Sequence, residues 1–452
     1  MASCRQHLLF RRILSCVTSR ARKKIPSQRW FSLFTSNPKS SKNHGSFEPK
    51  IYDVVIVGGG IMGSSSAYFM ANRMAPEMGR ICVIEQDPTY TRASTVLSLA
   101  GIRSQFSMAE NIQMCQFSFQ FMSDVGQILA VDGCDPPDIQ LRRRGYLFLA
   151  SSDGEDVMQK NYALQSKLGC QVTLLTVKDL KERFPWLNTE GLSLASLGTG
   201  NEGYFDPWSL LNAFKRKAIS LGVDYVNGEA VDFDTDQNGQ ISSVKVVSSS
   251  SPKNVNVIHC GQLVNAAGPN AGYLAEKLGI DLPVRPRKRY VFVLDCPGAP
   301  ANESFPLGFL VDPSGLYIRH DGARFLSGLS PKSMEDYDSS DFEVDYDYFN
   351  DRMWETIAHR IPAFECLKVQ SAWAGHYDYN TLDQNAIIGR HPEVRNLIFV
   401  NGFSGHGIQQ SPAAGRAVSE LILDGGFQTI DLSLLGFERV LRNEPMREKN
   451  IV

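Results

Sequence analysis

Apolar positions along the chain fall into distinct local patterns. Short continuous apolar runs predict buried strands at 52–57, 81–84, 223–226, 263–267 and 397–400. Patterns typical of helices lie at 64–71, 109–129, 210–221, 341–361 and 412–423. Alternating stretches at 139–150 and 231–264 predict antiparallel strands. The mixture of βα units and β-meander pieces indicates an α/β protein.

The order of these patterns predicts two lobes that the chain enters more than once. We expect a Rossmann-like lobe and a second, mainly antiparallel β-sheet lobe that carries helices. The predicted Rossmann-like lobe is discontinuous and comprises residues 51–135, 200–283 and 385–440. The remaining ordered segments are assigned to the second lobe, 136–199 and 284–384, and to a C-terminal tail, 441–452.

Charge is distributed unevenly along the chain. The 452 residues carry a formal net charge of −2, but residues 1–47 hold ten Lys or Arg and no acid, which leaves −12 for the remainder. This acidic body argues against nucleic acid as a partner. The basic segment is rich in Arg and Ser, and Leu9, Phe10 and Ile13 recur near helical spacing, which is typical of a mitochondrial presequence followed by a linker. A disordered basic tail is the alternative.

The spacing of cysteines and histidines argues against a metal site. The nine cysteines contain no C-x-x-C pair, and the eight histidines contain no H-x-x-x-H pair. We therefore expect neither a bound metal nor a disulfide scaffold. No apolar run approaches the roughly eighteen residues that suggest a membrane span, so we expect a soluble or peripherally bound protein.

Three glycines follow the first predicted strand at the spacing G-x-G-x-x-G. Gly58, Gly60 and Gly63 stand directly behind residues 52–57, and Glu85 closes the second apolar run. This spacing lets a pyrophosphate approach the backbone at a helix N-terminus and places a carboxylate where a ribose hydroxyl needs an acceptor. A glycine-rich turn in an ordinary βα unit is the alternative. The motif alone does not distinguish NAD from FAD.

Two later motifs extend this glycine fingerprint. One strand ends on Ala266, Ala267 and Gly268, and the glycine-rich loop 402–407 precedes an apolar helix. With the fingerprint, they resemble the FAD-dependent amine oxidoreductases, such as sarcosine oxidase, glycine oxidase and dimethylglycine dehydrogenase, from residue 51 to about 432. The resemblance implies a glycine/sarcosine oxidase-like fold with FAD as cofactor. It implies cofactor contacts at Gly58, Gly60, Ile61, Met62, Gly63, Glu85, Gln86, Ser94, Thr95, Val231, Ala267, Gly268, Gly402, Gly405, Gly407 and Ile408.

The same resemblance implies two residues that act on the substrate. His406 corresponds to the family's active-site histidine, and Arg103 to the arginine that binds the substrate carboxylate. A guanidinium fork suits a carboxylate because it can donate two parallel hydrogen bonds. A structural histidine and an exposed loop arginine are the alternatives.

The chain departs from the family pattern at several positions. The second carboxylate-binding cation falls on Gln409, and Leu326 stands where sarcosine oxidase has an oxygen-activating lysine, which favours a dehydrogenase over an oxidase. The cysteine that links flavin in sarcosine oxidase corresponds to His376, and the linking histidine of dimethylglycine dehydrogenase falls on Val96 or Leu97. We therefore expect non-covalent FAD.

A closer resemblance is to mitochondrial members of this family that are tied to the assembly of respiratory complex I. It rests on the segments 93–95, 101–106, 184–186, 205–208, 286–291 and 373–380. It implies a matrix protein that retains FAD and binds complex I assembly intermediates or subunits, which is the hypothesis we favour. The alternative is a matrix FAD-dependent dehydrogenase of a secondary amine or N-methyl amino acid.

A basic run lies at the start of a predicted strand in the second lobe, from Arg285 to Arg289. We interpret it either as a solvated face or as a contact with anionic inner-membrane lipid or an acidic subunit. The second interpretation would place the protein at the membrane periphery.

Overall fold

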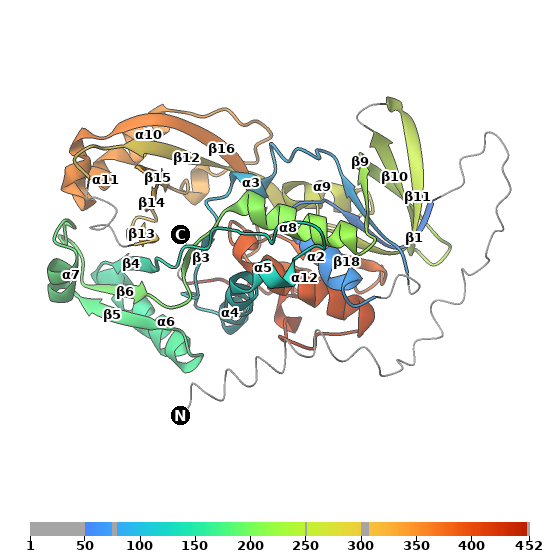
Figure 1. Cartoon of the computed structure of the whole chain (residues 1–452), viewed down its shortest axis with the longest axis horizontal. Helices are drawn as coiled ribbons and strands as arrows, with labels where there is room; N and C mark the ends of the chain where they lie inside the picture. The colour runs from blue at the N-terminus through green and yellow to red at the C-terminus, as the bar shows by residue number, and fades with distance from the viewer. Residues whose placement is uncertain (1–49, 75–78, 249–250, 300–306, 450–452) are drawn as a thin grey trace.

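The structure is a computed structural model that describes residues 50–74, 79–248, 251–299 and 307–449. The molecule is elongated, with one β-sheet toward each end of its long axis and helices packed against both sheets (Figure 1). The predicted presequence, residues 1–47, lies outside the described residues. Among the helices that the structure describes, none has both the length and the apolar character needed to cross a lipid bilayer.

The first sheet has the glycine fingerprint at the end of a central strand. Its order is β17-β18-β11-β1-β2-β8, with β10 and β9 continuing from β11. Strands β18, β11, β1, β2 and β8 run parallel to one another. The strands are β1 (Lys50–Val57), β2 (Ile81–Glu85), β8 (Asp224–Asn227), β9 (Glu229–Thr235), β10 (Ile241–Ser248), β11 (Ser251–Asn265), β17 (Ile387–Arg390) and β18 (Leu397–Asn401).

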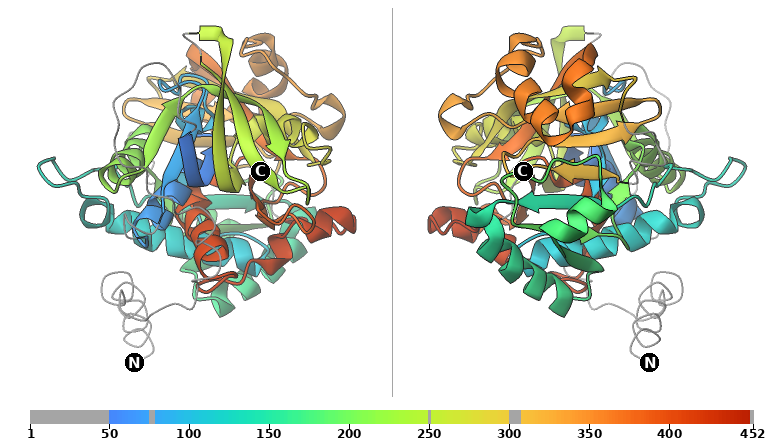
Figure 2. Two further views of the ribbon diagram at one scale, coloured as in Figure 1. Left: turned by 90° about the vertical axis from the view of Figure 1, so that its right-hand side faces the viewer. Right: turned by 90° about the vertical axis from the view of Figure 1, so that its left-hand side faces the viewer.

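Both faces of this sheet are covered, which explains the continuous apolar runs of its strands. On one face, Val54 and Ile56 pack against α2 (Ile61–Ala71), α4 (Ala109–Ser123), α8 (Pro207–Ser220) and α12 (Gly407–Leu423). On the other face, Val55 and Val57 pack against β9, β10 and α9 (Ala271–Glu276). Figure 2 (left) shows β9, β10 and β11 at the near end of the long axis.

The second sheet forms the other lobe. Its order is β16-β12-β15-β14-β13-β4-β6-β5, and its pairs are antiparallel except for β13 and β4. Its strands are β4 (Tyr146–Ala150), β5 (Val172–Thr176), β6 (Leu194–Gly198), β12 (Val284–Asp295), β13 (Phe309–Val311), β14 (Tyr317–Asp321), β15 (Arg324–Gly328) and β16 (Lys368–Asn380). Its helices are α6 (Glu155–Lys167), α7 (Val177–Arg183), α10 (Asp347–Arg352) and α11 (Trp354–Arg360). The predicted fold class is confirmed.

Several elements differ in extent from the sequence prediction. The helix predicted at 109–129 is divided at Asp124 into α4 and α5 (Val125–Ile128). The helix predicted at 341–361 is divided into α10 and α11, and its first six residues are not helical. Only Tyr146–Ala150 of the predicted pair at 139–150 forms a strand.

Helix α12 begins five residues earlier than the sequence pattern suggests. Pro412 lies inside the helix and cannot donate to the Ile408 carbonyl, which would ordinarily end or kink it. The Ser411 hydroxyl donates to that carbonyl instead, at 2.9 Å. The helix can therefore start at Gly407, next to the glycine-rich loop.

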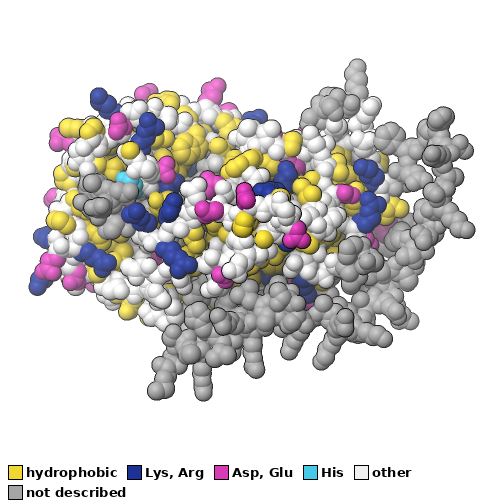
Figure 3. Space-filling view, viewed as in Figure 1, with side chains coloured by type: hydrophobic (Ala, Val, Ile, Leu, Met, Phe, Trp, Pro, Cys, Tyr) yellow, Lys and Arg dark blue, Asp and Glu magenta, His cyan; other side chains and the backbone are white. Residues whose placement is uncertain are grey.

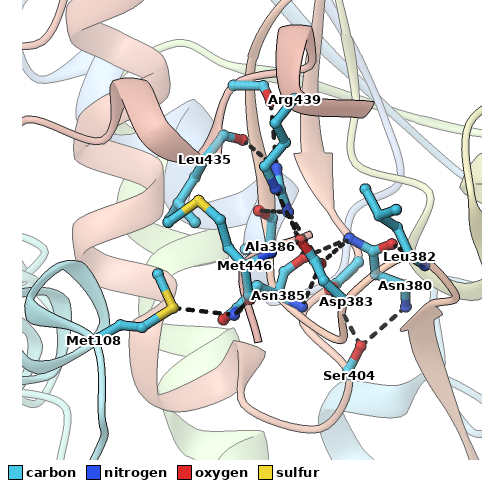
Figure 4. A network of polar contacts seen from close by, with 12 residues as sticks. Met108, Asn380, Leu382, Asp383, Asn385, Ala386, Ser404, Leu435, Arg439 and Met446 are labelled. Atoms are coloured by element: carbon cyan, nitrogen blue, oxygen red, sulfur yellow. Dashed lines mark hydrogen bonds and ion pairs between the residues drawn. The ribbon is translucent and has the colours of Figure 1, made fainter. Parts of the chain in front are cut away.

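The C-terminal tail is docked onto the first lobe by buried polar contacts. Arg439 forms a buried ion pair with Asp383 at 3.0 Å. The backbone N–H of Met446 donates to the same carboxylate, at 2.9 Å (Figure 4). This network holds the short helix α13 (Glu438–Leu441) and the residues that follow it against the first lobe.

Farther along the tail, a buried carboxylate meets the start of α4. Glu448 accepts hydrogen bonds from the Ser107 N–H and from the Asn111 side-chain amide, both at 2.6 Å. Helix α4 has no side-chain cap from its own N-cap residue, Met108. Glu448 therefore acts as an N-terminal cap supplied from a distant part of the sequence.

Candidate functional site

A cavity of about 1010 Å³ lies between the two lobes. Its volume reaches the upper end of the roughly 300–1,000 Å³ range of ligand pockets. Most of the residues predicted from the sequence line this cavity. They are Gly58, Gly60, Ile61, Met62, Glu85, Gln86, Ser94, Thr95, Arg103, Ala267, Gly268, Gly405, His406, Gly407 and Ile408.

Three predicted contact residues do not line the cavity. Val231 lies one position beyond the segment 228–230, which does line it. Gly63 instead allows the close approach of α2 to the first turn, since a Cβ there would lie 1.8 Å from the Gly58 carbonyl oxygen. Gly402 has φ +75° and shapes the turn after β18. Cofactor contact at these three residues stays a prediction, and Gly63 and Gly402 also have these structural roles.

The fingerprint glycines bring bare backbone to the cavity wall. Gly58 has φ +100°, and a Cβ there would lie 2.3 Å from the Ala266 carbonyl oxygen, so only glycine fits. A Cβ on Gly60 would meet nothing closer than the Thr95 hydroxyl at 3.4 Å, so this position is open toward the cavity. The first amides of α2 have no intrahelical acceptor and favour a phosphate.

Polar groups at the same end of the cavity fit the rest of a dinucleotide. Glu85 accepts the Gly59 N–H at 2.7 Å, which fixes its carboxylate beside the fingerprint. Burial raises the pKa of Glu85, while the N–H groups of Asp87 and Gly59 oppose that rise. The buried Tyr90 hydroxyl lines this wall and has no hydrogen-bond partner among the residues that the structure describes. No sequence motif identifies Tyr90, whose unsatisfied hydroxyl suits a cofactor hydroxyl or phosphate.

At the opposite end of the cavity, Arg103 and His406 are in direct contact. Nη2 of Arg103 lies 3.1 Å from Nε2 of His406, and Nη1 donates to the Gln105 carbonyl at 2.9 Å. The guanidinium lies over the rings of Phe106 and Phe148, at 4.3 and 5.0 Å from their centroids. Because a guanidinium can only donate, Nε2 of His406 is the acceptor and its proton is on Nδ1.

Burial makes His406 neutral and encloses Arg103. Burial, and secondarily Arg103, lowers the pKa of His406 to about 3, so the imidazole is neutral at physiological pH. Arg103 is only 4% exposed and forms no ion pair with any carboxylate of the described residues. Only two of its five N–H groups are engaged. A buried guanidinium without a counter-ion favours an anionic ligand.

Glu202 supports the segment that carries Arg103, and sequence analysis missed it. Its carboxylate accepts the Ser104 N–H and the Gln105 side-chain amide, both at 2.8 Å. It lies beside the short strand pair β3 (Gly101–Ile102) and β7 (Gly203–Tyr204), which brings the two segments together. Nothing in the local sequence distinguishes Glu202 from a surface acid.

The loop 402–407 is held by a buried aspartate. Asp378 accepts the Phe403 N–H at 3.1 Å, and burial raises its pKa to about 6. Gly405 has φ +96°, and a Cβ there would lie 2.4 Å from the Tyr377 ring. Close packing of Tyr377 therefore requires glycine in this loop. The N-terminus of α12 follows directly and faces the cavity at Gly407.

The departures from the family pattern have different structural consequences. Gln409 lines the cavity, and its side-chain oxygen accepts a hydrogen bond from the backbone N–H of Arg103 at 2.9 Å. Leu326 is buried within β15 and does not line the cavity. His376 lines the cavity, and its Nε2 lies 2.8 Å from the Asp341 carbonyl oxygen.

Each cation of the basic run in β12 forms an ion pair with an acid of the chain. Arg285 pairs with Glu276 at 2.8 Å, and Arg287 with Asp338 at 3.3 Å. The remaining pairs are Lys288 with Asp341 at 2.7 Å and Arg289 with Asp336 at 2.8 Å. The charge of the run is therefore balanced within the molecule, and contact of this strand with lipid or an acidic subunit stays a prediction.

Known proteins resemble the chain along nearly its whole length. The family model described as FAD dependent oxidoreductase matches residues 53–421. FAD-dependent oxidoreductase domain-containing protein 1 of Xenopus laevis is 47% identical, with 95% of this chain and 89% of that protein covered. The protein of that name from Bos taurus is 43% identical, with 92% and 90% covered.

A solved structure of L-proline dehydrogenase from P. horikoshii shares the fold, with a TM-score of 0.74 and 24% identity, over 88% of this chain and 100% of that one. The matched family and the geometry of the cavity agree on the cofactor, because bare glycine backbone, a helix N-terminus and an unsatisfied hydroxyl fit FAD. The chain therefore belongs to the FAD dependent oxidoreductase family, and its cofactor is FAD.

Proposed function

We propose that this oxidoreductase acts on the carbon–nitrogen bond of a small secondary amine or N-methyl amino acid that carries a carboxylate. The observation that carries the proposal is the buried Arg103, which has no carboxylate partner in the described chain and lies on the cavity wall. A substrate carboxylate would supply the missing counter-charge and accept the remaining N–H groups.

Each residue at this end of the cavity has a definite part in binding. Arg103 binds the carboxylate, and the neutral His406 holds the guanidinium in position by accepting one of its hydrogen bonds. The positive charge of Arg103 also disfavours a protonated amine nearby, which leaves the nitrogen lone pair free. FAD, when bound, would supply the oxidising capacity for the carbon next to nitrogen.

Relatives support an amine as the substrate. A glycine oxidase from Geobacillus kaustophilus is 25% identical to the chain over 82% of its length. No lysine is among the described residues that line the cavity, and we therefore propose a dehydrogenase rather than an oxidase.

An anaerobic titration tests this proposal. The FAD-loaded protein would be titrated with sarcosine, dimethylglycine and proline while the flavin absorbance is followed, and we expect at least one amine to bleach it. Arg103→Gln should weaken the apparent affinity for that amine by roughly 10- to 100-fold, because it removes one or two hydrogen bonds from a charged donor. Arg143→Gln is the matched control because Arg143 is exposed and outside the cavity. Absence of bleaching by all three amines would reject this substrate class.

We also propose that the protein works in the mitochondrial matrix and assists the assembly of respiratory complex I. This proposal is supported by the presequence pattern in residues 1–47 and by the motif resemblance described above. Cells that lack the protein should contain less assembled complex I, and re-expression should restore it. Normal complex I in such cells would defeat the proposal without affecting the amine titration.

A further inference from the structure

The outer end of the second lobe carries a segment of unusual composition, residues 334–355. It contains nine Asp or Glu and one Arg, interspersed with aromatic residues. It includes α10 and α11, which lie at the end of the long axis opposite β9–β11 (Figure 1) and face the viewer in Figure 2 (right). The acids of its first half, up to Asp341, form ion pairs, whereas the acids from Glu343 onward form none among the described residues.

The acids in the first half of the segment form ion pairs with other residues of the chain. Asp336, Asp338 and Asp341 pair with the cations of β12, and Glu335 pairs with Arg352 at 2.9 Å. The other five acids of the segment form no ion pair among the described residues, and all of them are exposed: Glu343, Asp345, Asp347, Asp351 and Glu355. This end of the molecule therefore presents a local excess of negative charge.

A small groove of about 300 Å³ lies at this segment, and several of the free acids are sequence neighbours of the residues that line it. It is lined by Tyr346, Phe349, Asn350, Trp354, Leu367 and Val369. Tyr346 and Trp354 remain 51% and 40% exposed, and Met334 and Tyr337 nearby in the sequence are 86% and 72% exposed. In the view of Figure 3, hydrophobic and acidic side chains both reach the surface over this part of the second lobe. Exposed aromatic residues around a groove are characteristic of protein interfaces.

We propose that this groove, formed by α10, α11 and the start of β16, is a docking surface for a basic amphipathic segment of a partner protein. The apolar face of such a segment would fill the groove between Tyr346 and Trp354, and its Lys or Arg would meet the free acids. Arg352 and Lys368 are the cations nearest in sequence to the groove residues, and Arg352 is already paired with Glu335. The excess of acids selects a cationic partner and disfavours an anionic membrane.

This proposal does not depend on the reaction at the flavin, because none of the groove residues lines the FAD cavity. A substitution in the groove should therefore leave FAD binding and amine titration unchanged. That separation allows the docking surface to be tested in the intact holoprotein.

Peptide binding to the FAD-loaded protein tests the proposal. The probe is a labelled eighteen-residue helical peptide of Leu and Lys, with a Leu and Glu peptide of the same pattern as its counterpart. Anisotropy should report binding of the Lys peptide only. The triple variant Asp347→Asn, Asp351→Asn, Glu355→Gln and the single variant Trp354→Ala should each weaken it on the order of tenfold.

A matched control removes three exposed acids elsewhere in the second lobe: Asp153→Asn, Asp156→Asn, Glu190→Gln. It should bind the Lys peptide like the unmodified protein, and all variants should keep the same FAD content. Equal weakening in the control triple would show attraction to the acidic body in general and overturn the proposal. Trp354-dependent binding to anionic vesicles, without peptide binding, would assign the surface to a membrane and also overturn it.

Discussion

At the scale of single residues, burial fixes the charges around the substrate end of the cavity. His406 is neutral because burial lowers the pKa of its imidazole, and Arg103 keeps its charge next to it. Burial also raises the pKa of Glu202 to about 7 and that of Asp378 to about 6. These two carboxylates accept backbone N–H groups from the segments that carry Arg103 and the glycine-rich loop.

The raised pKa of Glu202 predicts a pH dependence of stability. The native carboxyl keeps its proton between about pH 4.5 and 7, where the unfolded chain has lost it, so its contribution to stability falls as pH rises through this window. Glu202→Gln cannot ionise. The difference in unfolding free energy between the unmodified protein and this variant should therefore decrease by about 3 kcal/mol from pH 4.5 to 7.5.

Urea unfolding at several pH values measures this difference. Glu190→Gln is the control, since Glu190 is exposed. The difference in unfolding free energy between the unmodified protein and Glu190→Gln should not change comparably with pH. A difference that stays constant with pH for Glu202→Gln would contradict the predicted ionisation.

At the scale of elements, two glycines near the turn between β1 and α2 have different roles. Gly63 allows α2 to pack closely against the turn, and Gly60 leaves the cavity open. Gly63→Ala would place a Cβ 1.8 Å from the Gly58 carbonyl oxygen and force α2 away from β1. It should destabilise the protein by about 3 kcal/mol or more, as overpacking does. Gly60→Leu points a side chain into the open cavity and should abolish FAD binding while the apoprotein stays folded. The FAD content of the two purified variants and the circular dichroism of their apoproteins measure the contrast. An equal loss of folding in both variants would refute the predicted difference between the two glycines.

The C-terminal tail offers a second prediction at this scale. Glu448→Ala would leave the Ser107 N–H and the Asn111 amide without their acceptor, at a cost of about 1–3 kcal/mol for each buried group. Glu444→Ala is the control because its ion pair with Arg442 is about 60% exposed on both sides and is worth roughly 0–1 kcal/mol. Thermal unfolding should rank the two variants in that order. A similar melting temperature for both would show that the tail does not cap α4.

The sequence predicts elements whose determinants are local, and it fails where distant segments meet. The apolar runs of β1, β2 and β18 identify buried strands because both faces of that sheet are covered. Glu202, Tyr90 and Glu448 carry no such local pattern, because each acquires its partners only when remote segments pack together. The ion pairs of Arg287, Lys288 and Arg289 in β12 could not be predicted for the same reason, since their acids lie about fifty residues later.

At the scale of the whole molecule, the cavity that fits FAD has walls from both lobes. A ligand that binds only the folded state stabilises it by RT ln(1 + [L]/Kd), about 2.7 kcal/mol at one hundred times Kd. Added FAD should therefore raise the melting temperature of the apoprotein until binding saturates. Trp373 in β16 also donates to the Leu97 carbonyl at 3.0 Å, which couples the second sheet to the wall of the first lobe.

Non-covalent attachment can be tested on the same holoprotein. His376 is the wall residue that corresponds to the family's linking cysteine, but its Nε2 already lies 2.8 Å from the Asp341 carbonyl oxygen. Acid precipitation should therefore release all the FAD to the supernatant, because hydrogen bonds and a helix dipole do not survive unfolding. A pellet that stays yellow would show a covalent bond. If His376→Ala then released the colour, His376 would be the residue that forms it, whereas persistent colour would point to another wall residue.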